Sequence, residues 1–285
     1  MARKSKSLWS HAWTSLKKDK MTLCSIVVIS VYFLVALFSF LGFMATSWNI
    51  EIGPSYAAPS SDFWFGLDIF GRSVAEKTLK GAEIAVSVGL ITCLISSVIG
   101  VALGAVSGYF GGKVDEFLIW FYTVFTSIPN ILLLVAFAWV LGKGMLTVYL
   151  SLGLTGWTGL YRLIRGEFIR HKNREYVHAA TAIGVSDTKK IFKHILPNTF
   201  HIVIINFSLQ FQTAIKSEVI LSYLGLGVQG KPSWGVMIND SKLELARGYW
   251  WQLASATIAM MILVLAFNIL SDALRDALDP KLKGK

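Results

Sequence analysis

The chain has 285 residues, of which 54% are hydrophobic and only 15% are charged. Soluble domains carry about 25% charged residues, and one core of this size cannot bury so much apolar surface, so an ordinary soluble protein is excluded. The formal net charge of +10 fits either a nucleic-acid partner or an anionic membrane face. The positions of the basic residues decide between the two.

Residues 1–20 form a basic segment ahead of the first apolar run. Apolar residues recur in it at helical spacing, at Trp9, Ala12, Trp13 and Leu16. This spacing predicts an amphipathic helix on the cytoplasmic membrane surface; the alternative is a disordered basic leader. We expect no cleavable signal peptide, because the following apolar run is too long for one.

Six apolar segments are long enough to cross about 30 Å of hydrocarbon, which takes roughly 20 helical residues each. They lie at approximately 21–44, 84–108, 117–141, 145–164, 199–226 and 252–271. The sequence therefore predicts an all-α membrane protein with six transmembrane helices, in a transmembrane domain of residues 21–285.

The Lys and Arg residues are distributed unevenly between the segments that join these spans. Of the 27, 19 lie in the N-terminal segment, the turn 109–116, the loop 162–198 and the C-terminal tail. Because cytoplasmic loops carry the excess of basic residues, we expect both termini and the loop 162–198 in the cytoplasm. Residues 45–83 and 229–251 are then extracytoplasmic loops. The lipid bilayer accounts for the net charge, and no nucleic-acid partner is expected.

Four glycines repeat at every fourth position in and after the second span: Gly100, Gly104, Gly108 and Gly112. This period places them on one helix face. Without side chains there, another helix can approach closely. The stripe predicts a tightly packed bundle and gives no information about a substrate.

In the span 117–141, Pro129 removes one backbone hydrogen bond and clashes with the carbonyl of Phe125, which predicts a kink. The kink would place Ser127 and Asn130 at mid-membrane. Two interpretations stay open: a gate or pathway lining, and a structural kink whose polar neighbours satisfy the freed carbonyl.

Lys216 and Glu218 are the charged residues at membrane depth in this assignment of spans. Facing lipid would be costly, so we expect both to face the bundle interior or an aqueous cavity. At positions i and i+2 they do not share a helix face, so we expect different partners. The alternative is that they snorkel near the outer interface, and the pathway interpretation is favoured more for Glu218 than for Lys216.

The sequence shows no catalytic or metal-binding constellation. None of its five histidines has HExxH or comparable ligand spacing, and no GxxxxGK(S/T) phosphate loop occurs. We therefore expect no catalytic residue, no metal and no cofactor on this chain, which is not predicted to be an enzyme. If transport needs ATP, another chain must bind it.

The segment Glu175–Asn198 is basic, polar and placed between two spans. Residues 175–183 are good helix formers, and Gly184 suits a turn with positive φ. Ser186 and Asp187 then favour the start of a second helix, 187–195, which Pro197 is expected to end. A cytoplasmic helix-turn-helix of this kind is a docking device for a partner. The alternative, a solvated loop, explains the charges but not the small residues Ala179 and Ala180.

This segment resembles the EAA loop of ABC importer permeases, whose pattern is Glu-Ala-Ala, three residues, Gly, and Leu-Pro further on. The matching residues are Ala179, Ala180, Gly184, Leu196 and Pro197. His178 stands where the Glu of that triplet is usual, which puts in question the polar contact that this Glu makes to the ATPase.

Four further blocks are similar to the C-type permease subunits of the dipeptide, oligopeptide and nickel importers. They are Phe65–Ser73, Gly108–Glu116, Leu221–Gly235 and Ala266–Pro280. In the first block Leu67 and Ser73 replace the usual Thr and Asp. Lys216 stands where an apolar residue is usual, which suggests a difference in substrate.

The resemblance implies an ABC importer permease fold with a cytoplasmic coupling loop at residues 165–198. Residues in that loop are expected to touch an ATPase: Glu175, Tyr176, His178, Ala179, Ala180, Gly184, Asp187, Leu196 and Pro197. The candidate residues for the substrate pathway are Ser127, Pro129, Asn130, Lys216 and Glu218.

The resemblance also implies partners and a mechanism. A second, related permease subunit forms a heterodimer with this chain, two cytoplasmic ABC ATPases bind ATP and Mg, and an extracytoplasmic protein delivers substrate. The expected function is translocation of di- or oligopeptides across the bacterial cytoplasmic (inner) membrane by alternating access. The alternative substrate is nickel or another small solute. The alternative class of protein is an ATP-independent secondary transporter, and a membrane-embedded enzyme is the third class.

Overall fold

The computed structural model describes residues 16–278, and over that range the protein is all-α. Its helices are α2 (Lys20–Phe40), α3 (Val74–Phe110), α4 (Gly112–Ser127), α5 (Asn130–Leu141), α6 (Met145–Thr155), α7 (Thr158–Lys172), α8 (Glu175–Ala182), α9 (Asp187–Lys189), the π-helix η1 (Lys190–Ile195), α10 (Leu196–Tyr223), α11 (Trp234–Ala246) and α12 (Trp251–Leu278). The predicted fold class is confirmed. Most of the amphipathic helix predicted over residues 1–20 lies outside the described residues.

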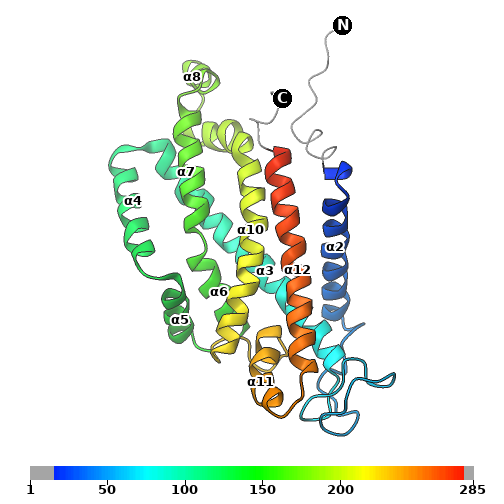
Figure 1. Cartoon of the computed structure of the whole chain (residues 1–285). Coiled ribbons are helices and arrows are strands. Elements are labelled where there is room, and N and C mark those ends of the chain that lie inside the picture. Colours follow the sequence, from blue (N-terminus) through cyan, green and yellow to red (C-terminus); the bar gives the residue numbers. More distant parts are fainter. Residues whose placement is uncertain (1–15, 279–285) are drawn as a thin grey trace.

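The helices form a bundle with two distinct ends (Figure 1). The short helix α8 projects from one end, here named the α8 end, and α11 lies at the other, the α11 end. Helix α2 begins and α12 finishes at the α8 end. Helix α3 packs on α2, α6, α7 and α10, so it lies at the centre of the bundle, and α12 packs on α2, α10 and α11.

The predicted glycine stripe brings α3 and α7 into close contact. A Cβ atom on Gly104 would lie 2.8 Å from a carbonyl oxygen of α7, and one on Gly108 would lie 2.6 Å from another. Gly100 faces the backbone beside α7 in the same way. The backbones of the two helices thus lie close enough for extensive van der Waals contact, which replaces the hydrophobic driving force that is absent in lipid. The prediction is wrong for Gly112, which begins α4 with φ +52° and has nothing within 4 Å of its Cβ position.

Three described helices, α2, α3 and α12, are long and apolar enough to cross a membrane. Helices α4 and α5 make a fourth span if they count as one, but they are bent by 90° at a short break. The predicted kink at Pro129 is confirmed, and it divides the segment 117–141 into two helices; that this segment forms one span stays a prediction. The physical reason is that proline drives the preceding Ile128 into an extended conformation, with ψ 130°, which ends α4.

The predicted span 145–164 is also divided, because α6 ends at Thr155 and α7 begins at Thr158. Gly156 lies at the break, and glycine is a poor helix former. Helix α10 covers most of the predicted span 199–226 but is not among the three apolar helices. Six membrane spans therefore stay a prediction.

Both predicted extracytoplasmic loops contain helix. Helix α3 begins at Val74, so the last ten residues of the segment 45–83 are helical. The segment 229–251 holds α11, which has 13 residues. Each helix starts after a serine, Ser73 or Ser233, whose hydroxyl accepts a backbone N–H of the first turn. Serine is among the best N-cap residues, so the local sequence contains a signal for the start of each of these two helices.

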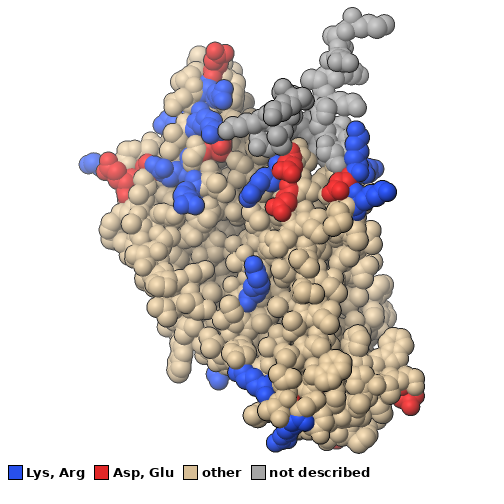
Figure 2. Space-filling view, in the orientation of Figure 1, with Lys and Arg blue, Asp and Glu red and all other residues tan. Residues whose placement is uncertain are grey.

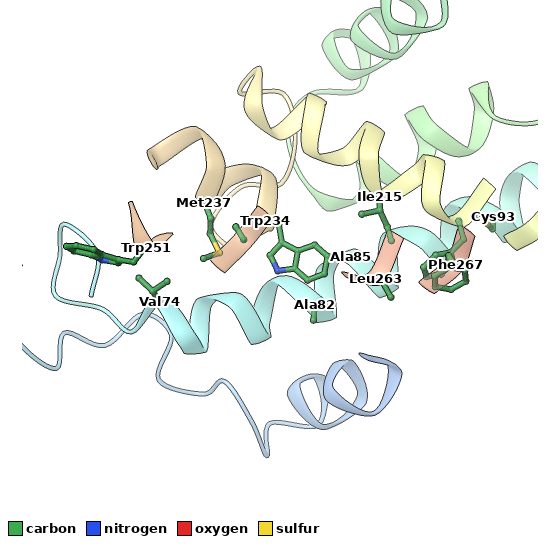
Figure 3. Packing of buried hydrophobic residues seen from close by; sticks show 12 residues of the cluster. Val74, Ala82, Ala85, Cys93, Ile215, Trp234, Met237, Trp251, Leu263 and Phe267 are labelled. Carbon is green, nitrogen blue, oxygen red and sulfur yellow. The ribbon is translucent and has the colours of Figure 1, made fainter. Parts of the chain in front are cut away.

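Aromatic and small residues join α11 to α3 near the α11 end (Figure 3). Trp234 is 1% exposed, and its indole N–H donates to the carbonyl oxygen of Thr78 at 3.0 Å. Gly81 lets the indole lie against α3, since a Cβ there would be 2.4 Å from the ring. Phe211 of α10 stacks on Phe267 of α12 with ring centroids 4.1 Å apart. This core fixes α11 to the bundle.

Candidate functional site

The predicted coupling loop, residues 165–198, comprises the end of α7, the short helices α8 and α9, the π-helix η1 and the first residues of α10. Helix α8 projects from the bundle (Figure 1). Glu175, Tyr176, His178 and Ala179 are exposed on it. Ala180 is 5% exposed and therefore faces the bundle rather than a partner.

The buried face of α8 is anchored by apolar contacts. Val177 lies in one cluster with Ile164 and Phe168 of α7 and with Ile191 and Ile195 of η1. These side chains are at most 7% exposed. The cluster holds α8 in place and leaves its polar face free.

Gly184 forms the turn after α8, as the sequence predicts. Its φ is +77°, and nothing lies within 4 Å of its Cβ position. Its N–H donates to the carbonyl oxygen of Thr181 at 3.0 Å, and the N–H of Val185 donates to that of Ala180 at 3.0 Å, which satisfies the free carbonyls at the helix end. Ile183 is 80% exposed beside this turn. Sequence reasoning missed it, because one exposed aliphatic residue leaves no periodic signal.

Asp187 is held by two side chains. The hydroxyl of Tyr109 donates to its Oδ1 atom at 2.6 Å, and the ammonium of Lys190 lies 2.8 Å from the same oxygen. The hydrogen bond from Lys190 and then that from Tyr109 lower the pKa of Asp187, and the bond to Asp187 raises the pKa of Lys190. Sequence reasoning used Asp187 as a negative charge at a helix start and as a candidate ATPase contact, and it predicted neither of these two side-chain partners. The i,i+3 spacing of Lys190 was an available signal, whereas Tyr109 is 78 residues away.

The predicted helix stop at Pro197 is wrong. The π-helix η1 leads directly into α10, whose first residue is Leu196, and Pro197 lies in its first turn. Proline is tolerated there because N–H groups of a first turn have no helical partner. Leu196 is half-buried and Pro197 is exposed. The predicted N-cap Ser186 precedes α9 without a side-chain hydrogen bond to it.

A second polar cluster ties α4 to α7. The guanidinium of Arg165 donates to both carboxylate oxygens of Asp115, at 2.7 Å each. The hydroxyl of Ser107 also donates to Asp115 and lies 3.1 Å from that of Tyr161. Bidentate pairs of this kind are among the stronger polar contacts. They fix the α3–α4 turn beside the coupling loop.

The predicted pathway residues of the bend, Ser127, Pro129 and Asn130, are all exposed. The hydroxyl of Ser127 donates to the carbonyl oxygen of Val124 at 2.7 Å, so it satisfies a carbonyl of α4. Helix α4 packs on α3, and α5 packs on α6. The bend between α4 and α5 therefore lies at the edge of the helical bundle.

Lys216 and Glu218 lie on different faces of α10, as their spacing predicts. Lys216 is exposed, whereas Glu218 is 1% exposed and accepts from the hydroxyl of Ser222 at 2.6 Å. The same hydroxyl accepts the N–H of Val228 at 3.2 Å. Glu218 thus helps to hold the segment after α10 against the helix. The structure does not bring Lys216 and Glu218 together.

A polar cavity of about 490 Å³ lies at the α11 end. In its wall the ammonium of Lys77 lies 2.9 Å from Asp68 and 2.8 Å from the side-chain oxygen of Gln252. The amide of Gln252 donates to Glu244 at 3.1 Å, and burial raises the pKa of Glu244. Sequence reasoning placed Asp68 and Lys77 in a loop and missed this network, because Gln252 is 175 residues from Lys77.

A helical bundle with three described helices long and apolar enough to cross a membrane has the architecture of an integral membrane protein. The chain belongs to the family of binding-protein-dependent transport system inner membrane components, whose model matches residues 100–284.

Curated relatives are similar over almost the whole chain. The dipeptide transport system permease protein DppC of Bacillus subtilis is 36% identical over 99% of this chain and 88% of its own length. The oligopeptide transport system permease protein OppC of the same organism is 34% identical over 99% and 93%. The glutathione transport system permease protein GsiD of Escherichia coli is 32% identical over 97% and 91%.

The fold is also similar to a solved structure. A chain of the MetNI methionine ABC transporter, in inward-facing conformations, matches with a TM-score of 0.58 and 16% identity. The match covers 71% of this chain and 96% of that one. At this identity it supports the shared fold alone.

Proposed function

We propose that this chain is the C-type permease subunit of an ATP-driven importer that moves di- or oligopeptides across the bacterial inner membrane. Family membership supports the permease role. The substrate class follows from three relatives named for dipeptides, oligopeptides and glutathione, all of which are peptides.

The single observation that carries the ATP-driven role is the exposed face of α8. Glu175, Tyr176, His178 and Ala179 are exposed on a helix whose other face is anchored in the bundle. An exposed isoleucine, Ile183, adds an apolar contact at its tip. A rigid, exposed helix with a mixed surface suits docking to another protein. In this proposal two ATPase subunits, which bind ATP and Mg, dock at the α8 end.

The distribution of charge supports the orientation. Lys and Arg side chains gather at the α8 end, and below it follows a broad band that is nearly free of charged residues and is interrupted by an isolated basic side chain (Figure 2). Cytoplasmic segments carry such an excess of basic residues. We therefore assign the α8 end, with the start of α2 and the end of α12, to the cytoplasm. The α11 end, with its polar cavity, then faces the substrate-binding protein.

A second permease subunit completes the pathway in this proposal. Ser127 and Asn130 at the bend and Lys216 on α10 are polar and exposed on the single chain. Polar groups facing lipid at membrane depth are costly. A heterodimer would place them, with Pro129, toward the partner permease and the solute. Glu218, which is buried within this chain, would stabilise that surface from inside the bundle.

The test is uptake by the complete complex in proteoliposomes, with the partner permease, both ATPases and the binding protein. We expect a labelled dipeptide to cross the membrane only when ATP is present on the side that carries the ATPases. Uptake driven by an ion gradient without ATP would overturn the proposal in favour of a secondary transporter. ATP-driven uptake of nickel without peptide uptake would overturn the substrate class alone.

A further inference from the structure

One side chain of the central helix reaches into the coupling loop. Tyr109, the penultimate residue of α3, is 6% exposed. Its ring lies in the same apolar cluster as Val177 of α8 and Ile191 of η1. Its hydroxyl donates to Asp187 of α9 at 2.6 Å. A single residue of α3 therefore contacts the loop through both its ring and its hydroxyl.

The polar contacts around Tyr109 gather several short elements. The ammonium of Lys190, which pairs with Asp187, also donates to the hydroxyl of Thr181 on α8 at 3.2 Å. The ammonium groups of Lys190 and Lys172 lie 5.9 Å and 5.7 Å from the centroid of the Tyr109 ring, within the range of cation–π attraction. Tyr109 and Asp187 thus connect α3 with α7, α8, α9 and η1.

Helix α3 is able to carry a displacement through the molecule. It is a continuous helix of 37 residues, which corresponds to about 55 Å at 1.5 Å per residue. Its cytoplasmic half is locked to α7 by the glycine contacts at Gly104 and Gly108. Near its other end, Lys77 joins Asp68 and Gln252 in the wall of the polar cavity. A rigid element of this kind moves as one body.

We propose that the Tyr109 hydroxyl is a positioning group that holds the coupling loop to α3 through Asp187, so that movement of the docked loop moves α3. This inference rests on the proposed function. The apolar cluster under α8 remains when the hydroxyl is removed, so the loop still folds and the ATPases still dock. The loop can then shift relative to α3, and part of each ATP-driven displacement is lost.

The test is Tyr109→Phe in the complete complex, measured as peptide molecules imported per ATP hydrolysed. The variant keeps the ring and removes the hydroxyl. We expect unchanged co-purification of the ATPases, sustained ATP hydrolysis, and a severalfold fall in peptide imported per ATP. The matched control is Tyr149→Phe, which removes a hydroxyl that donates to Ser87 of the same helix at 3.1 Å, outside the coupling loop. The control should keep the wild-type ratio.

A double variant tests whether Tyr109 acts through Asp187. If the bond between them is the cause, Asp187→Asn combined with Tyr109→Phe lowers the ratio no further than the more harmful single change, because interacting residues are not additive. Additive losses, or a wild-type ratio in Tyr109→Phe, overturn the inference. So does a variant in which uptake and hydrolysis fall in proportion with ATPase binding, the result expected of a purely structural residue. If the wild-type complex shows no ATP-driven uptake, the proposed function fails before this step.

Discussion

At the α11 end, Lys77, Asp68 and Glu244 are buried in one polar network, whereas at the α8 end the charged and polar residues of α8 stand exposed on a projecting helix. The buried network holds a loop, α11 and α12 in a fixed geometry, and losing one partner leaves an unpaired charge. The exposed residues contribute little to folding, because water already solvates them. The contrast suggests that one end is built for internal rigidity and the other for contact with a partner.

The largest effect is expected from Gly184→Trp at the α8 end. A non-glycine residue at φ +77° is strained, and the indole would stand beside the proposed docking face. We expect the variant to insert into the membrane normally but to lose co-purification of the ATPases and ATP-dependent uptake. The matched control is Gly142→Trp, since Gly142 also has positive φ and open space, in the α5–α6 turn. Wild-type uptake by Gly184→Trp would contradict the coupling role.

Lys77→Met tests the α11 end. It leaves Asp68, which is 2% exposed, without its cation. Breaking one partner of a buried ion pair costs about 3–5 kcal/mol, so we expect a large fall in stability, measured by thermal unfolding in detergent. Arg170→Ala removes a surface pair with Glu167 in which the arginine side chain is 65% exposed, and such pairs contribute only about 0–1 kcal/mol. Equal losses in the two variants would erase the contrast between the ends.

Gly104→Leu is expected to act between the two ends, where α3 meets α7. Its Cβ would lie 2.8 Å from the carbonyl oxygen of Tyr161, and backbone cannot give way as a side chain can. Overpacking of a close contact costs about 1–3 kcal/mol. The same change at Gly166, which has nothing within 4 Å of its Cβ position, should leave the unfolding temperature close to that of the wild type. A small effect at Gly104 would refute tight packing of α3 on α7.

The smallest effect is a pH dependence at Glu244. Burial raises its folded pKa above the ordinary value of 4.5, so the folded chain keeps a proton that the unfolded chain loses. The stability of the wild type therefore falls as pH rises from 4.5 through the raised pKa. Glu244→Gln removes this cost. We expect it to melt slightly higher than the wild type at pH 7 and to lose that advantage below pH 4.5. A difference independent of pH would exclude the titration of Glu244 as its cause.

The parts that the sequence predicts well depend on neighbours along the chain. The glycine period from Gly100 to Gly108, the turn at Gly184 and the kink at Pro129 follow from backbone geometry and helix period. The role of Pro197 was assigned wrongly, because proline is compatible with the first turn of a helix as well as with a stop. Local sequence alone does not decide between the two.

The contacts that join distant segments were not predictable from one sequence. Tyr109 meets Asp187 across 78 residues, and Lys77 meets Gln252 across 175. Such pairs depend on how whole helices pack, and no periodic pattern in the local sequence indicates them. The exposed face of α8 was predicted as a docking surface, but the burial of Ala180 depends on the apolar cluster beneath it. The docking role of this face stays a prediction, whereas the orientation of the side chains on α8 could be assigned only from the structure.

The most direct measurement is a cross-link from α8 to an ATPase subunit in the assembled complex. Ala179→Cys would carry the linker, in a chain whose exposed Cys24 is replaced by serine, and Leu243→Cys on α11, where Leu243 is 74% exposed, would be the control. The predicted result is a covalent product between position 179 and an ATPase subunit, with none from position 243. An ATPase cross-link from position 243 and none from position 179 would contradict the docking role of the α8 end.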